Sequence, residues 1–190
     1  SNVAVGALAS DAMTTASFNV ALGTSALSTE TQGNRNTAIG HAALAASNTT
    51  SNADTYNTAV GCLAGLSVTT GSKNTLIGGL TGDAITTGVN NVAVGYLALS
   101  ATTTAVENTA IGSGALLVNT TGTANVAVGQ GSLDANTTAS NNTAIGHDAL
   151  TANTTGAGNT AVGKNAGDAI TTGTNNTVIG NASAAGSVSA

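Results

Sequence analysis

Apolar and polar positions recur along this chain with a fixed period. An asparagine opens each copy, followed by Thr or Val, then usually Ala, then Val, Ile or Leu, and then Gly. Eleven copies begin at Asn2, Asn19, Asn36, Asn57, Asn74, Asn91, Asn108, Asn125, Asn142, Asn159 and Asn176. The step between neighbouring copies is 17 residues nine times and 21 residues once. A fixed period of this length indicates a solenoid-like repeat array, and residues 1–190 are expected to form a single one.

One repeat predicts one coil of a parallel β-solenoid. We number each repeat from its asparagine, so that Asn142 is position 1 and Gly146 is position 5. Positions 1 to 4 predict a short β-strand, because they favour β-branched residues and show no helical period. The glycine at position 5 either takes a positive φ or lets another backbone approach closely. Thr-Thr-Gly at positions 13 to 15 is typical of a turn.

The apolar positions predict a narrow core. Val, Ile or Leu at position 4 is expected to point inward together with the small residue and Leu at positions 8 and 9, so Ile145 is interpreted as a core residue. Three coils have Gly at position 9 and an aliphatic residue at position 12, and we expect these pairs to fill the same interior space from another point on the coil. The pairs are Gly65 with Val68, Gly82 with Ile85, and Gly167 with Ile170.

The single irregular step predicts a loop. Four extra residues fall between Asn36 and Asn57, at about residues 50–56. An insertion in a solenoid normally bulges out as a loop.

Stacked coils place the asparagines in a column. Strands about 4.8 Å apart would make eleven coils into a rod of roughly 50 Å. Side-chain amides stacked along such a rod can hydrogen-bond from coil to coil and fix the register. The expected structural ladder comprises Asn36, Asn57, Asn74, Asn91, Asn108, Asn125, Asn142 and Asn159. A helical-hairpin solenoid is the structural alternative, but the Gly, Thr and Asn content argues against helices.

Composition narrows the class of protein. Charged residues make up 6% of the chain and aromatic residues 2%, whereas typical soluble domains are roughly 25% charged. The regular apolar positions argue against disorder. The net charge is −5, and the three basic residues do not form the basic stripe that binding to nucleic acid needs. No apolar run is long enough for a membrane span. One cysteine excludes an internal disulfide, and without a starting Met the chain is expected to be a fragment or a processed product.

Position 6, just after the glycine, varies most between coils. Its side chains are expected to face outward, either as a solvated corner, the reading we favour, or as recognition groups. The candidates for recognition are His41, Tyr96, Gln130, His147 and Lys164. His41 and His147 lie six coils apart, roughly 30 Å by the stacking distance, so they cannot share one metal ion within a chain.

No constellation of residues predicts catalysis. The aspartates at position 10 (Asp11, Asp83, Asp134 and Asp168) never fall on adjacent coils, which favours turn capping over a calcium ladder. No Ser-His-Asp set and no phosphate-binding glycine loop is indicated. We therefore expect no enzyme activity, no cofactor and no metal site.

The repeat resembles a known family. Asn108–Gly112 through Thr121–Gly122 is similar to the N-T-A-I-G-x-x-A-L and N-T-T-G arrays of phage tail-fibre proteins, which are related to the head repeats of trimeric autotransporter adhesins. The resemblance covers about residues 2–184, although Asn replaces the Ser that opens an adhesin repeat. It implies a left-handed homotrimeric β-roll on the virion surface or outside the cell. It also implies a rigid fibre or stalk segment with a host-surface glycan or protein as a possible partner.

The low charge independently favours self-association. Much of the surface must be Ala, Val and Thr, and large apolar surfaces usually contact another chain. Two alternatives remain open. One is a monomeric ice-binding β-solenoid, because position 2 carries seven Thr and four Val. The other is a self-assembling extracellular filament, because uncapped solenoids can stack head to tail.

Overall fold

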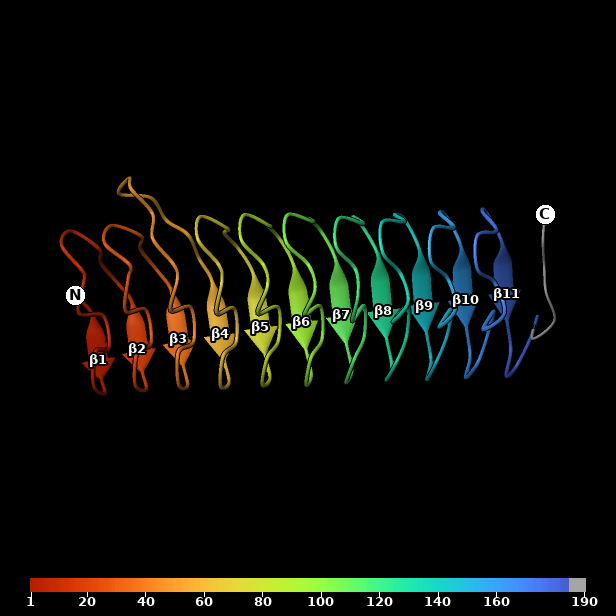
Figure 1. Ribbon diagram of the computed structural model, residues 1–190, viewed down its shortest axis with the longest axis horizontal. Coiled ribbons are helices and arrows are strands. Elements are labelled where there is room, and N and C mark those ends of the chain that lie inside the picture. The colour runs from red at the N-terminus through yellow and green to blue at the C-terminus, as the bar shows by residue number, and fades with distance from the viewer. Residues whose placement is uncertain (185–190) are drawn as a thin grey trace.

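The chain folds as a β-solenoid in which every repeat contributes one short strand. A computed structural model describes residues 1–184, so residues 185–190 of the expected array lie outside the described residues. The coils stack side by side into a rod with β1 and β11 at opposite ends (Figure 1). The strands are β1 (Val3–Val5), β2 (Val20–Leu22), β3 (Thr37–Ile39), β4 (Thr58–Val60), β5 (Thr75–Ile77), β6 (Val92–Val94), β7 (Thr109–Ile111), β8 (Val126–Val128), β9 (Thr143–Ile145), β10 (Thr160–Val162) and β11 (Thr177–Ile179).

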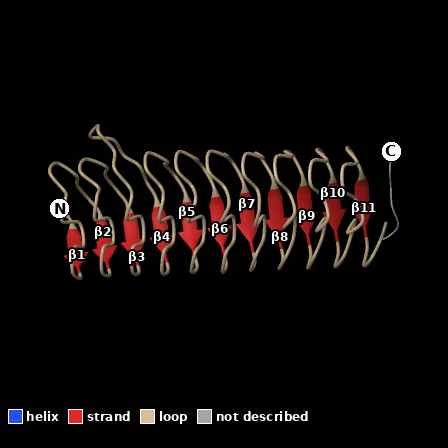
Figure 2. Ribbon diagram, viewed as in Figure 1, coloured by secondary structure: helices blue, strands red, loops and turns tan. Residues whose placement is uncertain are grey.

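All eleven strands form one parallel sheet in sequence order. Strands, turns and loops account for the whole of residues 1–184, without a helix (Figure 2). The predicted all-β parallel solenoid with its 17-residue repeat is therefore confirmed. Register follows the repeat, because equivalent positions pair: Ala127 of β8 lies opposite Ala144 of β9. Hydrogen bonds between coils continue outside the sheet, as from the Leu27 N–H to the Ala43 carbonyl oxygen at 3.1 Å.

The prediction that position 4 is in the core is wrong. Ile145, which we expected in the interior, is 41% exposed, whereas its neighbour Ala144 is fully buried. Successive side chains of a strand point to opposite faces, so with position 1 inward, position 3 is inward and positions 2 and 4 are outward. In most coils alanine fills the space behind the sheet and the larger β-branched residue faces out; Leu76 is buried there instead in the coil whose position 9 is Gly82.

The rest of the core is built as the sequence predicts. Leu133 and Leu150 at position 9 are fully buried, as is Ala149 at position 8. In the coils with Gly at position 9, the aliphatic residue at position 12 is fully buried instead, as Ile85 shows. A Cβ added at Gly82 would lie 2.9 Å from Ile85 Cδ1, so the two positions do share one interior space.

Three positions in each coil adopt left-handed backbone conformations. Positions 7, 9 and 17 have φ near +50° to +70°, and most of these residues are not glycine; Leu116 at position 9, for example, has φ of +52°. An isolated left-handed residue costs of order 1–3 kcal/mol and persists only where the surroundings fix it. Here hydrogen bonds to the neighbouring coils fix it, because the amide groups at all three positions bond to a carbonyl of an adjacent coil.

The insertion forms a loop that projects beyond the other coils between β3 and β4 (Figure 1). Its return is fixed by a parallel bridge between Asn34 and Asp54. Glu30 lies fully buried beneath it and accepts hydrogen bonds from Ser47 Oγ at 2.7 Å and Thr49 Oγ1 at 2.9 Å. The Gly33 and Thr49 amide groups also donate to this carboxylate, at 2.7 and 3.1 Å. One buried carboxylate thus organises the turn from which the insertion departs.

Candidate functional site

The asparagines at position 1 form a continuous hydrogen-bonded column. In one rung, the Asn142 N–H donates to Asn125 Oδ1 at 3.0 Å. Asn125 Nδ2 donates to the Ala139 carbonyl oxygen at 2.9 Å, which closes its own coil, and also to Asn108 Oδ1 at 3.2 Å. The structure places all eight predicted ladder residues in this column, fully buried or 1% exposed. Apart from Asn36, each of these amide groups therefore closes one coil and joins it to a neighbouring coil.

The column changes at the insertion. In most other coils, Nδ2 of the asparagine reaches the carbonyl group 14 residues onward. In the coil that starts at Asn36, Nδ2 is buried without a partner among the described residues. Thr55 takes part instead, because its hydroxyl group donates to Asn36 Oδ1 at 2.8 Å and to the Asn34 carbonyl oxygen at 3.0 Å.

A second, shorter asparagine column lies inside the rod at position 12. Asn119, Asn136 and Asn153 are fully buried. Asn136 Nδ2 donates to Asn119 Oδ1 at 2.9 Å, and Asn153 Nδ2 donates to Asn136 Oδ1 at 3.4 Å. We did not anticipate this column from the sequence. Its signal in the sequence is the Asn that precedes Thr-Thr in three successive coils.

The position 6 residues lie exposed at the corner after the sheet and do not gather into one site. His41, Tyr96, Gln130, His147 and Lys164 are all exposed. His147 Nδ1 lies 2.8 Å from Asp148 Oδ2. Cys62, at the same position of the next coil, places its Sγ 3.9 Å from His41 Nδ1.

The position 10 aspartates sit in different surroundings. Asp134 Oδ1 accepts a hydrogen bond from Thr151 Oγ1 at 2.8 Å, and Asp168 Oδ2 accepts a long one from Asn165 Nδ2 at 3.4 Å. Burial raises the pKa of Asp83 despite nearby hydrogen-bond donors. These carboxylates therefore do not form a ligand set.

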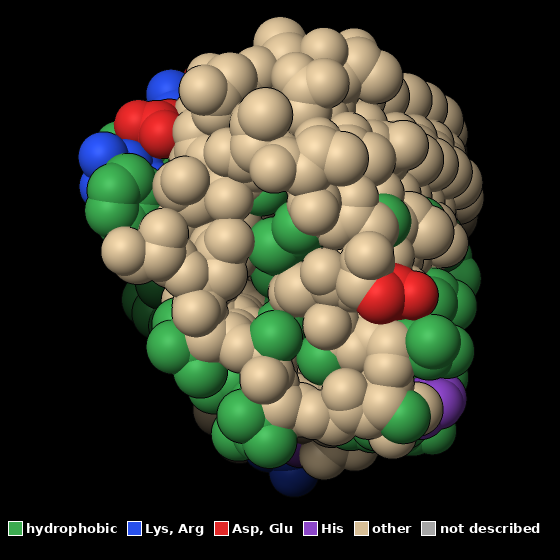
Figure 3. All heavy atoms as spheres, turned by 90° about the vertical axis from the view of Figure 1, so that its left-hand side faces the viewer, with side chains coloured by type: hydrophobic (Ala, Val, Ile, Leu, Met, Phe, Trp, Pro, Cys, Tyr) green, Lys and Arg blue, Asp and Glu red, His purple; other side chains and the backbone are tan. Residues whose placement is uncertain are grey.

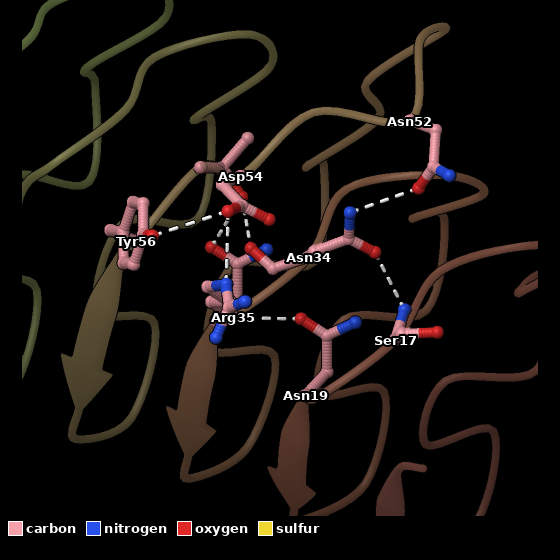
Figure 4. Close-up of polar contacts among 9 residues, drawn as sticks. Ser17, Asn19, Asn34, Arg35, Asn52, Asp54 and Tyr56 are labelled. Atoms are coloured by element: carbon pink, nitrogen blue, oxygen red, sulfur yellow. Dashed lines mark hydrogen bonds and ion pairs between the residues drawn. The ribbon is translucent and has the colours of Figure 1, made fainter.

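Charged and aromatic side chains concentrate instead at position 17, immediately before the ladder asparagine. Four successive coils carry such residues there: Phe18, Arg35, Tyr56 and Lys73. Tyr56 follows the insertion but is counted as position 17, because it also directly precedes a ladder asparagine. The Arg35 guanidinium carbon lies 5.0 Å from the Phe18 ring centroid and 5.8 Å from that of Tyr56. Its Nε donates to Asp54 Oδ2 at 2.9 Å, and the Tyr56 hydroxyl group donates to the same oxygen at 3.1 Å (Figure 4).

This cluster lies on the surface of the rod. Phe18 is 59% and Tyr56 50% exposed. Seen along the rod, basic and acidic side chains lie next to each other at one corner, whereas the other charged groups visible in this view stand apart from one another (Figure 3). Desolvation of the Asp54 carboxyl group raises its pKa, but the hydrogen bonds from Arg35 and Tyr56 and the charge of Arg35 outweigh this, so the pKa is below its ordinary value. Asp54 therefore stays ionised and holds the guanidinium group in place.

The described residues offer no enclosed site. Residues 1–184 contain neither a pocket nor a group of three metal-ligating side chains. No helix in this part of the chain is long and apolar enough to cross a bilayer. In comparisons with known proteins, no protein-family model, curated protein or solved structure matches this chain.

Proposed function

We propose that this chain is a segment of a fibre or stalk on a virion or cell surface, in which three copies pack side by side. The segment acts as a rigid spacer, with no catalytic role, and its exposed corners meet a host-surface glycan or protein. The solenoid architecture is compatible with this structural role. The repeat of Asn108–Gly112 resembles those of tail-fibre arrays, and this resemblance supports a fibre or stalk over other structural roles.

The observation that carries the proposal is the outward face of the sheet. Positions 2 and 4 place two columns of β-branched side chains on this face, with Leu22 as the one exception, and none of them is charged. The larger members are well exposed: Leu22 46%, Ile77 39%, Ile111 39% and Ile145 41%. The position 4 column is aliphatic in every coil and runs along the whole sheet beside the Thr and Val of position 2. An exposed apolar stripe of this length is typical of a contact with another chain.

The dimensions of this face suit the centre of an interface. Eleven three-residue strands cover on the order of 500 Å² at the usual strand spacing and rise per residue. A stable interface buries about 800 Å² on each partner, so residues beside the sheet would form its rim. The face supports self-association, and the number of three chains rests on the resemblance.

Two residues of the same coil test where the chains meet. Ile111 on the sheet face and Val118 at position 11 are β-branched and 39% and 38% exposed. We expect Ile111→Lys to dissociate the trimer, because it would bury like charges near the threefold axis, and Val118→Lys to leave the trimer intact. Sedimentation velocity measures both. If Ile111→Lys sediments like the unaltered protein, the sheet face is not the interface.

A second candidate function is ice binding by a monomer. The outward threonine column at position 2 supports it, because Thr37, Thr58 and Thr75 are partly exposed on three neighbouring strands. Regular hydroxyl and methyl groups on a flat face can order water. A thermal-hysteresis assay at high protein concentration separates the candidates: ice shaping by a monomer would replace the fibre proposal, and its absence would reject ice binding.

A further inference from the structure

The corner of the rod at position 17 brings together most of the basic and aromatic side chains of the chain, which are the groups best suited to bind a ligand. The sequence contains three Lys or Arg residues and three aromatic residues in all. Two of the basic residues, Arg35 and Lys73, and two of the aromatic ones, Phe18 and Tyr56, occupy this position in neighbouring coils. We name these four residues, with Asp54 beside them, the position 17 patch. The insertion supplies Asp54, so the one irregular coil completes the patch.

The patch holds its guanidinium group in a fixed orientation. Arg35 lies between the rings of Phe18 and Tyr56, and its Nε is bonded to Asp54. The Arg35 N–H donates to the Ser17 carbonyl oxygen at 3.1 Å, and the Lys73 N–H to that of Thr55 at 2.7 Å, so the backbone is fixed as well. Among the described residues, Nε alone of the guanidinium nitrogens has a hydrogen-bond partner. Both terminal amino groups therefore remain for a ligand.

We propose that the position 17 patch binds an acidic oligosaccharide, with carboxylate groups of the sugar on Arg35 and Lys73 and ring faces of the sugar against Phe18 and Tyr56. Guanidinium groups pair with carboxylates in a planar, bidentate geometry. The two cations stand two coils apart, about 10 Å along the rod, with Tyr56 between them. A chain of sugar rings with carboxylate substituents also alternates anionic groups with apolar ring faces, which matches this order of cation, ring and cation.

The surroundings favour a sugar over a peptide. Peptides usually dock by adding a strand to an open sheet edge or by filling a groove. Strands β2 to β10 are each paired on both sides, and residues 1–184 contain no pocket. An open column of rings and cations suits a ligand that lies along the surface.

This proposal rests on the host-surface contact of the proposed function, which binding at the patch would supply. Binding at the patch does not require a trimer. A monomer that binds would overturn the proposed assembly and leave the patch intact. A trimer that does not bind would overturn the patch alone.

Calorimetric titration with tetragalacturonate tests the proposal, and its methyl ester serves as the uncharged control. We expect the acid to bind, the ester to bind at least about tenfold more weakly, and added salt to weaken binding of the acid. Lys73→Gln and Phe18→Ala should each weaken binding several-fold, whereas Lys164→Gln, which removes a base from a different corner, should not. Both patch residues are exposed, so these variants should fold, and circular dichroism verifies it.

Three results would overturn the proposal. They are no binding of the acid, equal loss of binding in Lys73→Gln and Lys164→Gln, and equal binding of a tetra-aspartate peptide. The last result would show that negative charge alone is recognised and that the rings contribute nothing.

Discussion

Gly112 meets two requirements that a larger residue cannot meet together. Its φ is +133°, and an added Cβ would lie 2.5 Å from the Gly129 carbonyl oxygen of the next coil. Gly114 in the same coil has φ of +67° with open space around it. Position 7, which Gly114 occupies, accepts leucine elsewhere, as at Leu97 with φ of +57°.

We therefore expect Gly112→Ala to destabilise the fold by about 3 kcal/mol or more, because backbone must move, and Gly114→Ala by about 1 kcal/mol. Denaturant unfolding of the two variants measures the difference. Equal losses would show that the close approach between coils does not restrict position 5.

Asn125 offers a matched test of the ladder. Replacing it with alanine leaves the Asn142 N–H buried without its partner. The Ala139 carbonyl oxygen loses the bond from Asn125 and keeps the one from Asn136 Nδ2 at 3.1 Å. We expect Asn125→Ala to lower the free energy of unfolding by about 1–3 kcal/mol, the usual cost of one buried unpaired group. Asn141→Ala is the control, since Asn141 is exposed at position 17, where Ala124 occurs naturally. A loss in Asn125→Ala no larger than in the control would mean that the column does not hold the coils in register.

Single residues were predictable where their identity repeats without exception. Asn125 and Gly112 belong to positions that hold one residue type in every coil. An invariant asparagine predicts a hydrogen-bonded side-chain column, and an invariant glycine predicts a backbone corner. The left-handed conformation of Leu116 and Leu133 was not predictable. Leucine does not favour it, and the hydrogen bonds between coils that impose it exist only after stacking.

At the scale of the element, strand positions were predictable but the inward face was not. The repeat Thr143-Ala144-Ile145 alternates equally well with either set of side chains inside. Aliphatic size favours Ile145, but the interior that already holds a leucine at position 9 takes Ala144. In the coil whose position 9 is Gly82, position 3 takes the larger Leu76. The two-residue period of a strand determines which side chains share a face. The space left in the interior decides which of the two faces points inward.

The insertion turn makes stability depend on pH through Glu30. Burial raises the pKa of this carboxyl group, but hydrogen bonds from Ser47, Gly33 and Thr49 outweigh burial, so its pKa in the folded state is below the ordinary 4.5. A lowered pKa contributes stability that is present above the ordinary value and is lost as pH falls through the folded value.

We expect Glu30→Gln to cost about 1–3 kcal/mol at pH 7, because charge-assisted hydrogen bonds are lost. The difference from the unaltered protein should shrink when unfolding is measured well below the ordinary pKa. Glu107→Gln, which removes an exposed carboxylate, controls for the loss of one negative charge. A cost of Glu30→Gln that is the same at both pH values would show that the ionised carboxylate does not organise the turn.

At the scale of the whole molecule, the rod followed from the period and the shortness of the repeat. Its two surface features did not. The sequence did not predict the apolar sheet face, because the aliphatic residues of position 4 were expected in the core. The composition showed only that the chain as a whole carries few charges. The position 17 patch was missed because residues as different as Phe18, Arg35 and Lys73 share a column only once the coils are stacked.

The mass of the protein in solution tests the proposed assembly most directly. One chain weighs 17.9 kDa. Sedimentation equilibrium over a range of micromolar concentrations should give a species of about three times that mass, because each sheet face would be covered by its neighbours. A single species with the mass of one chain at every concentration would contradict the account, since the sheet face would then be exposed to water along the whole rod.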